Sequence, residues 1–276
     1  MTVAASLAEM PLYTNLDRVA RGLAAEGIGP ADPIPPERLF PLDQWHYHGT
    51  DAIRAAAERL RLGPGSHVLE IGSGIGGPAR YLAHTTGCRV TAVELQPNLH
   101  EIAVDLTRRT GLTSRVTHVC GDALTCGLPE GAFDAVGAWL AIVHIPQRPR
   151  LLARMAAALR PGGGCHIEDL CQRAPFDAAG RRDLREVVVA ATITPIDQYV
   201  TELREAGFGV VEATDLTSDW APYAAERLAA WRANHDAYAK VSGEGAFVAQ
   251  EHFYAVIARL YDSGSLGGVR LVANKT

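Results

Sequence analysis

Short apolar runs alternate with stretches of helical periodicity along most of this chain. From residue 67 onward, the β-branched or apolar runs read HVLEIG, RVTAVEL, VTHVCGD, FDAVGAWL and GCHIEDL, and helical spacing separates each run from the next. Strands separated by helices of that length require right-handed crossovers, so the pattern predicts a parallel sheet covered by helices on both faces. VVEATDL and GGVRLVANK predict two further strands near the C-terminal end.

The regions around this alternating part differ in pattern. Residues 16–23 look amphipathic, and the prolines of residues 31–41 interrupt any helix and predict a linker. We therefore expect residues 1–50 to form an N-terminal helical arm and a strap, and residues 51–276 to form one main domain. A further helix is expected over residues 51–62.

An aromatic-rich helical stretch covers residues 220–261 and is too long for a simple connection between strands. It predicts a helical lid inserted at about residues 218–262, or a surface for a homodimer. Its aromatic side chains could wall a pocket or pack against one another; they are Trp220, Tyr223, Trp231, Phe253 and Tyr254.

Composition narrows the classes of function. A chain of 276 residues with 47% hydrophobic residues can bury one sizeable core, and a net charge of −5 gives no field that would gather a nucleic acid. Five cysteines without a CxxC pair support neither a disulfide framework nor a zinc ribbon. With no leader pattern and no long apolar stretch, the sequence predicts a cytoplasmic protein without a membrane partner.

The strongest motif is HVLEIGSGIGG, in which a hydrophobic strand ends at Glu70 and opens into a glycine-rich turn before a helix. Gly72, Gly74 and Gly76, with Ser73 between them, let the backbone turn sharply and approach a ligand at the carboxyl edge of the sheet. The string predicts a site for a nucleoside cofactor.

Acidic residues at the ends of the next two strands indicate which nucleoside cofactor is expected. Glu94 ends TAVELQ, followed by Leu95 and Gln96, and its carboxylate can accept hydrogen bonds from both ribose hydroxyls. Asp122 ends the third strand, beside Ala123, where a carboxylate can take an adenine amino group. A nicotinamide oxidoreductase has no comparable requirement for Asp122, so S-adenosylmethionine is favoured over a nicotinamide cofactor.

The ordered set of motifs resembles the class I S-adenosylmethionine-dependent methyltransferases of the small-molecule type. The motifs are EIGSG, Glu94, Gly121 with Asp122, Phe133 with Asp134, and LRPGG, which span about residues 60–170. The resemblance implies an α/β, Rossmann-like fold with a seven-stranded, mostly parallel sheet and an antiparallel last strand.

By the same resemblance, Glu70 and the glycines hold the methionine end of the cofactor, Glu94 holds the ribose, and Asp122 with Ala123 holds the adenine. Trp139 or Leu140 would pack near the adenine or the thioether, and the product would be S-adenosylhomocysteine. The HIP-x-R string resembles small-molecule methyltransferases that act on amino acids, amines, terpenoids or polyketides. The segments DQWHYHG, IEDL and LGGVRLVANK are similar to glycine, sarcosine and dimethylglycine N-methyltransferases and to natural-product C- and O-methyltransferases.

Candidate catalytic residues lie beyond the fourth and fifth strands. His144 could accept a proton or a hydrogen bond from the methyl acceptor, although it could equally bond a loop carbonyl. Of Glu168 and Asp169, only one can point into a pocket because side chains alternate along a strand. Glu168 is the preferred base, and its alternative is a structural role in helix capping or pairing with Arg173.

The segment 43–49, DQWHYHG, is named here the strap because its dense polar and aromatic groups suggest a cover over the cofactor. Gln44 is expected to contact the cofactor, His46 is a further candidate, and Tyr47 is a third catalytic candidate. The alternative is a surface loop that docks through its aromatic rings. His46 and His48 lack a third ligand at a suitable spacing, so no metal site is predicted.

Methyl transfer to a small molecule of bacterial specialised or amine metabolism is the leading hypothesis. One alternative is C-methylation of a prenyl diphosphate, with Glu168 as base and Mg²⁺ required only for that acceptor. Arginines would then hold the diphosphate, and the candidates are Arg148, Arg173, Arg181, Arg182 and Arg185. Another alternative is a relative that binds S-adenosylmethionine without catalysis.

Overall fold

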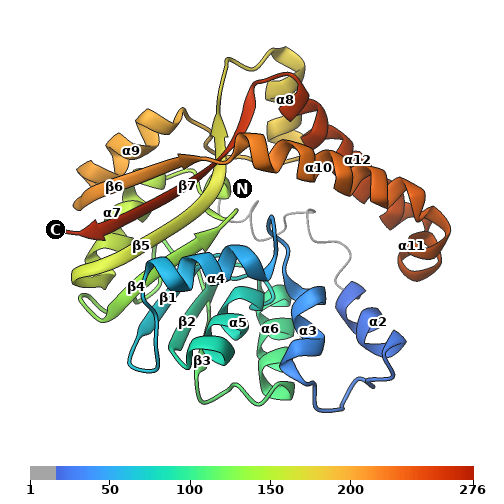
Figure 1. Cartoon of the computed structure of the whole chain (residues 1–276), viewed down its shortest axis with the longest axis horizontal. Helices are drawn as coiled ribbons and strands as arrows, with labels where there is room; N and C mark the ends of the chain where they lie inside the picture. The colour runs from blue at the N-terminus through green and yellow to red at the C-terminus, as the bar shows by residue number, and fades with distance from the viewer. Residues whose placement is uncertain (1–16) are drawn as a thin grey trace.

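A seven-stranded sheet organises residues 17–276, the part of the chain that the computed structural model describes (Figure 1). The strand order is β3-β2-β1-β4-β5-β7-β6. The strands are β1 (His67–Ile71), β2 (Arg89–Glu94), β3 (Val116–Cys120), β4 (Phe133–Trp139), β5 (Leu159–Gln172), β6 (Phe208–Asp215) and β7 (Leu266–Lys275). The first five strands pair in parallel, and β7 is antiparallel to both β5 and β6. The predicted Rossmann-like sheet with an antiparallel last strand is confirmed.

Helices cover both faces of this sheet, as its apolar strands require. On one face, α4 (Thr50–Arg59) and α5 (Gly77–Thr86) share a buried cluster with β1 and β2. α6 (Pro97–Arg109) contacts β2 and β3. On the other face, α7 (Arg148–Ala158) and α9 (Ile196–Glu205) pack on the centre of the sheet.

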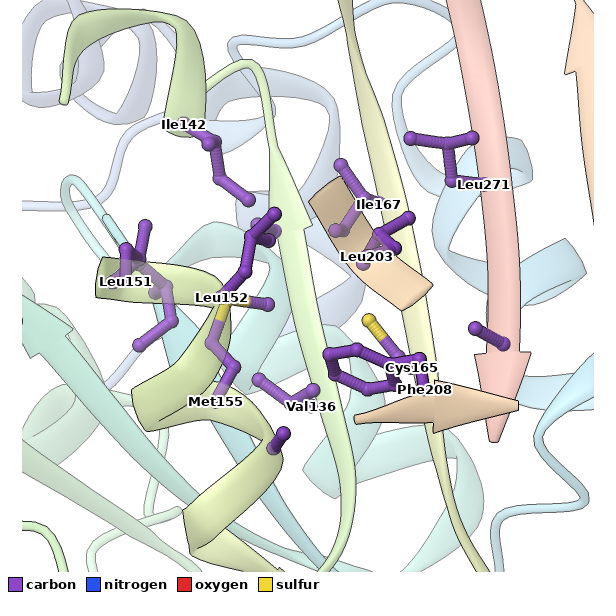
Figure 2. Close-up of a cluster of buried hydrophobic side chains, with 14 of the residues drawn as sticks. Val136, Ile142, Leu151, Leu152, Met155, Cys165, Ile167, Leu203, Phe208 and Leu271 are labelled. Carbon is purple, nitrogen blue, oxygen red and sulfur yellow. The ribbon is translucent and has the colours of Figure 1, made fainter. Parts of the chain in front are cut away.

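The cluster under α7 and α9 shows why the central strands read as continuous apolar runs. Figure 2 shows Val136 of β4 and Ile167 of β5 among side chains from the covering helices. Leu152 comes from α7 and Leu203 from α9, and each is fully buried. Burial of such side chains stabilises the fold by about 1.5 to 3 kcal/mol each. The packing of α7 and α9 on β4 and β5 therefore holds the central strands, and with them their carboxyl ends, in place.

The N-terminal region differs from the expected linker. α2 (Arg18–Ala25) agrees with the helix expected over residues 16–23, although residue 16 lies outside the described residues. α3 (Pro36–Asp43) occupies part of the proline-rich segment, so the linker prediction is wrong there. Pro36 stands in the first turn, where the missing N–H would have no helical partner, and the buried Leu39 and Phe40 anchor the helix.

The C-terminal helices are α10 (Thr217–Ala233), α11 (His235–Ser242) and α12 (Glu244–Asp262). α10 and α12 run side by side away from the sheet, with α11 at their far end near α2 (Figure 1). α10 is seated on β7 through Trp220, because a Cβ atom at Gly268 would stand 2.3 Å from its ring. None of the helices described within residues 17–276 is long and apolar enough to cross a membrane.

Two local features differ from the sequence prediction. α8 (Ala178–Glu186), capped by Asp177, was not predicted. β6 begins at Phe208, two residues before the predicted strand VVEATDL, because Gly207 in the left-handed conformation, with φ of +96°, follows α9.

Candidate active site

A cavity of about 200 Å³, named here the first cavity, lies at the carboxyl ends of β1, β2 and β4. It brings together most of the residues that the sequence assigned to a cofactor, which are Glu70, Gly72, Ser73, Gly74, Glu94, Leu95, Gln96, Asp122, Ala123 and Trp139. Leu140 lines it as well. Gly76 and Gln44 do not line it, so the structure gives no support to a direct cofactor contact from either residue.

The turn after β1 needs glycine for steric reasons. Gly72 has φ of +67°, and a Cβ atom there would lie 2.5 Å from Cβ of Ala141. Gly74 has φ of +55° with open space beside it, and its N–H donates to Oε2 of Glu94 over 2.8 Å. These conformations keep bare backbone against the cavity. Gly76 instead ends the turn, directly before α5.

The two carboxylates at the far side of this cavity are held by backbone donors. Glu94, at the end of β2, accepts from the N–H groups of Gly74 and Gln96, each over 2.8 Å. Asp122 accepts from the N–H of Leu124 over 2.8 Å. Each carboxylate retains lone pairs, because its two oxygens offer about four acceptor positions. Both are therefore fixed in place and still able to bind hydroxyl or amino groups of a ligand.

Glu70 is a buried acid without a full set of partners. It is 2% exposed, and its Oε2 has no hydrogen-bond partner among residues 17–276. Burial raises the pKa of this carboxyl group to about 8. Oγ of Ser73 and Nε1 of Trp139 are also buried and without partners in the described chain. Such groups are costly in a folded protein, and a ligand with an ammonium group and polar atoms would satisfy them. The residues therefore fit the methionine end of S-adenosylmethionine.

A second cavity of about 370 Å³ adjoins the first. Its lining comes from α2, the strap, the segment after β4, β5, the end of α8 with the residues after it, and the helices α10 and α12. Four residues line both cavities, namely Trp45, His46, Leu140 and His144. A ligand in the first cavity would therefore face a ligand in the second across this shared wall.

His144 has the geometry of a proton acceptor at that wall. It ends the short 3-10 helix η2 (Ile142–His144), and its Nδ1 lies 3.0 Å from the carbonyl oxygen of Val189. A carbonyl cannot donate, so Nδ1 carries the hydrogen and Nε2 is left as an acceptor. Burial lowers the pKa of this imidazole, which favours the neutral form. The loop bond that the sequence analysis gave as an alternative is thus present, and it orients the ring for the other role.

The residue that bonds this imidazole and one that lines the same two cavities both have strained backbone conformations. Val189, which supplies the carbonyl, has φ of +54°, and Leu140 has φ of +53°. Non-glycine residues rarely adopt this conformation, and a β-branched residue does so least readily. Strained positions of this kind persist where the surrounding structure holds them, often at functional sites.

The strap docks mainly through its side chains. The Tyr47 ring lines the second cavity and stacks on Trp220, with ring centroids 4.2 Å apart and planes 3° apart. Burial raises the pKa of Tyr47 to about 12, so its hydroxyl stays protonated near neutral pH. This argues for an orienting or packing role and against a base.

Gln44 acts within the strap itself. Its Nε2 donates to Oδ1 of Asp43 over 2.7 Å, and its Oε1 lies 3.0 Å from Nε2 of His46. Asp43 in turn forms a fully buried ion pair with Arg80, at 2.9 Å. His48 Nε2 lies 3.0 Å from a carboxylate oxygen of Asp219. Each histidine of the strap therefore has its own separate partner.

Glu168 and Asp169 line neither cavity. Glu168 pairs with Arg270 of β7 over 2.7 Å, and interactions with His166 and Arg270 lower its pKa. Asp169 points to the opposite face, where it accepts from the Tyr199 hydroxyl over 3.3 Å. This placement argues against Glu168 as a base and supports the structural alternative, with Arg270 as the partner in place of Arg173.

The arginines considered for a diphosphate also line neither cavity. Arg148 pairs with Glu202, Arg173 with Asp215, and Arg185 with Glu186. Two others, Arg18 and Arg227, do line the second cavity. Sequence reasoning missed them, although Arg227 follows Tyr223 by one helical turn, which places both side chains on one face.

Comparison with known proteins agrees with this geometry. Residues 68–163 match the family model described as the methyltransferase domain. The methyltransferase GfsG of Streptomyces halstedii is 33% identical over 173 residues, which cover 60% of this chain and 60% of that protein. The sarcosine/dimethylglycine N-methyltransferase of Halorhodospira halochloris is 32% identical over 174 residues, covering 60% of this chain and 62% of that protein. The alignments thus span about three fifths of these relatives.

Among solved structures, phosphoethanolamine N-methyltransferase 2 of Haemonchus contortus superimposes with a TM-score of 0.82 at 19% identity. The superposition covers 100% of this chain and 60% of that one, and that structure was determined with phosphomonomethylethanolamine and S-adenosylhomocysteine. The likeness shows that the two chains share a fold. Together with the family match, it confirms the resemblance to class I methyltransferases that the motifs indicated.

Proposed function

We propose that this chain, which carries the class I methyltransferase domain, transfers a methyl group from S-adenosylmethionine to a small-molecule acceptor. The observation that carries the proposal is the pair of adjoining cavities. The first cavity has the fixed carboxylates and bare backbone that a nucleoside needs, and the second is a larger space behind a shared wall. Methyl transfer is an in-line displacement that needs the nucleophile in contact with the methyl group, and a cofactor and an acceptor that meet where the two cavities adjoin would satisfy this requirement.

Different residues of the first cavity would bind different parts of the cofactor. Glu70 would bind the ammonium of the methionine moiety, Glu94 the ribose hydroxyls and Asp122 the adenine amino group. Trp139 and Leu140 supply the apolar surface beside these groups. When bound, the cofactor supplies an electrophilic methyl group on a sulfonium, and S-adenosylhomocysteine is the product.

His144 would serve the acceptor. Its Nε2 can take a proton from an N–H or O–H nucleophile, while the Val189 carbonyl holds Nδ1–H and so keeps the ring in place. Tyr47 and Trp45 of the strap, with α10 and α12, enclose the acceptor and exclude water. These features favour N- or O-methylation over C-methylation with Glu168 as base, because Glu168 lies outside both cavities.

A role in bacterial specialised or amine metabolism is part of this proposal. It is supported by the similarity to a Streptomyces methyltransferase and to a sarcosine/dimethylglycine N-methyltransferase. C-methylation of a prenyl diphosphate is not favoured, since Glu168, the base first considered for that reaction, lies outside both cavities.

Calorimetric titration tests the cofactor. S-adenosylmethionine and S-adenosylhomocysteine should bind one site per chain, and NADH should not bind. Binding of NADH with no response to either sulfur nucleoside would overturn the proposal.

Turnover and the role of His144 are tested together. A mass-spectrometric screen of amines, phenols and hydroxylated natural products should find an acceptor that gains one methyl group. With that acceptor, His144→Ala should lower kcat by about 10² to 10⁴ and leave affinity for S-adenosylhomocysteine within about twofold. His235→Ala, at an exposed histidine of α11, is the matched control and should keep wild-type turnover.

Unimpaired turnover in His144→Ala would remove the role of His144 but not the transferase. Cofactor binding with no methylation of any acceptor in the screen would instead favour a relative that binds the cofactor without catalysis.

A further inference from the structure

Arg227 is a cation held by neutral partners only. On α10, its Nε donates to the Tyr254 hydroxyl and its Nη1 to the Tyr223 hydroxyl, each over 3.0 Å. Its guanidinium lies 5.4 Å from the ring centroid of Tyr254 and 6.0 Å from that of Tyr223. Within residues 17–276, no carboxylate oxygen pairs with it, although it is half-buried and lines the second cavity.

Arg18 brings a second cation to the same cavity from a distant part of the chain. It belongs to α2, where its guanidinium lies 4.9 Å from the ring centroid of Trp45 and its Nη2 donates to the carbonyl of Leu42 over 3.4 Å. No carboxylate of the described residues pairs with it either. Burial lowers the pKa of Arg18 to about 10; the charge of Arg227 acts in the same direction, and that of Asp43, which is paired with Arg80, acts against it.

Two other buried or half-buried arginines have acidic partners. Arg148 pairs with Glu202 and Arg270 with Glu168. The second cavity does include one acid, Glu186, but that side chain is exposed and bound to Arg185. Two like charges without a directly paired carboxylate destabilise a folded protein unless an anion joins them. The positive charge in this cavity is therefore available to a ligand.

The tyrosine hydroxyls extend the set of donors. Tyr223 and Tyr254 each accept a hydrogen bond from Arg227, so the hydroxyl hydrogens remain free to donate. The other walls include the apolar side chains of Val143, Leu170 and Ile257. The cavity thus combines an apolar body with one group of converging donors.

We propose that Arg18, Arg227 and the hydroxyls of Tyr223 and Tyr254 form an oxyanion subsite that holds a phosphate or carboxylate group of a largely apolar methyl acceptor. This inference rests on the proposed function, because the subsite would orient the acceptor toward the wall that contains His144. Guanidinium groups suit the role because they form charge-assisted hydrogen bonds with oxyanions, often in pairs.

Three matched ligands test the subsite on the full chain saturated with S-adenosylhomocysteine. Phenyl phosphate, phenylacetate and neutral phenylacetamide share an aromatic body and differ in the polar group. In calorimetric titrations the two anions should bind, and the amide should bind at least about tenfold more weakly. A preference for phenyl phosphate over phenylacetate identifies a phosphate subsite, and the reverse order identifies a carboxylate subsite.

Variants assign the binding to the named residues. Arg227→Gln and Arg18→Gln should each weaken the preferred anion by about tenfold to hundredfold, whereas Tyr223→Phe should have a smaller effect. Arg232→Gln is the matched control, because Arg232 lies on the same helix but pairs with Glu251 outside the cavity. Arg227→Lys keeps a positive charge and should retain part of the affinity. It therefore tests the role of the charge even if the glutamine variant does not fold.

Equal affinity for the amide and the anions, or unchanged anion binding in both glutamine variants, would overturn the subsite. Failure of the proposed function is distinguishable, since it would show as absent binding of the sulfur nucleosides themselves.

Discussion

At the scale of single residues, Glu70 carries the clearest electrostatic signature. Its pKa of about 8 lies above the ordinary value because burial disfavours the ionised form. The unfolded chain releases this proton at lower pH than the folded chain does. The contribution of Glu70 to stability is therefore greatest below its ordinary pKa and is lost as pH rises toward about 8.

Glu70→Gln separates the effect of this buried acid on stability from its role in cofactor binding. Without cofactor, the variant should be at least as stable as wild type at neutral pH and more stable at pH values above the folded pKa, as measured by urea unfolding. Affinity for S-adenosylmethionine should fall about tenfold or more, because a charge-assisted hydrogen bond is lost.

The pH dependence of binding supplies the second readout. Wild-type affinity should rise as pH increases toward about 8, because the ligand ammonium favours the ionised carboxylate, and the glutamine variant should lack this rise. A variant that binds as tightly as wild type at every pH would contradict the assignment of Glu70 to the cofactor.

Residues such as Glu70, Glu94 and Asp122 could be predicted because each lies at or just beyond the carboxyl end of a strand, and parallel strand ends meet at one edge. Glu168 was placed at a strand end by the same reasoning, but β5 continues to Gln172, and the structure does not support the base role that was assigned to it. Its partner Arg270 lies 102 residues away in the sequence, and only the register between β5 and β7 brings them together. The cations of the second cavity escaped prediction for the same reason, since α2 and α10 are far apart in the chain.

At the scale of elements, the ion pair between Asp43 and Arg80 joins α3 to α5. Both side chains are 0% exposed, and Arg80 also donates to the carbonyl of Ala103 and the hydroxyl of Thr107. Asp43→Asn should destabilise the protein by about 3 to 5 kcal/mol, because it leaves a buried charge without its partner.

Chemical unfolding measures this effect against a surface control. Asp51→Asn removes the exposed pair with Arg54 and should cost no more than about 1 kcal/mol. An equal loss of unfolding free energy in the two variants would show that the buried ion pair of Asp43 contributes no more to stability than the exposed pair of Asp51. Cofactor affinity should also weaken in Asp43→Asn, since the strap begins at this residue and Asp43 lines the first cavity.

The elements that sequence analysis did not predict are short. α3 and α8 each have no more than nine residues, which is too few for periodicity to outweigh two prolines or a run of arginines. Tertiary contacts stabilise these helices, such as the burial of Leu39 in α3 and of Leu184 in α8. The longer helices and the apolar strands were predicted because their patterns repeat over several turns or residues.

At the scale of the whole molecule, a ligand in the first cavity would connect segments spread over residues 43–147, from the strap to the segment that follows β4. Ligand that binds only the folded state at 100 times its Kd adds about 2.7 kcal/mol to the free energy of unfolding. S-adenosylhomocysteine at that excess should therefore raise Tm by roughly 5 to 10 °C.

A thermal melt checks this shift. NADH at the same concentration should leave Tm unchanged, and the shift should be smaller for Glu70→Gln. A Tm that does not respond to either sulfur nucleoside would argue that the first cavity does not bind them.

The position of β7 between β5 and β6 also governs how the sheet can be completed during translation. β6 leaves the ribosome before α10, α11 and α12, yet its hydrogen-bonding neighbour in the described sheet is β7, which follows all three helices. Until then, β6 and one edge of β5 expose unpaired backbone groups, which are sites for aggregation. The nascent chain therefore cannot complete its sheet until β7 has been synthesised. A chain truncated within α12 would be prone to aggregation.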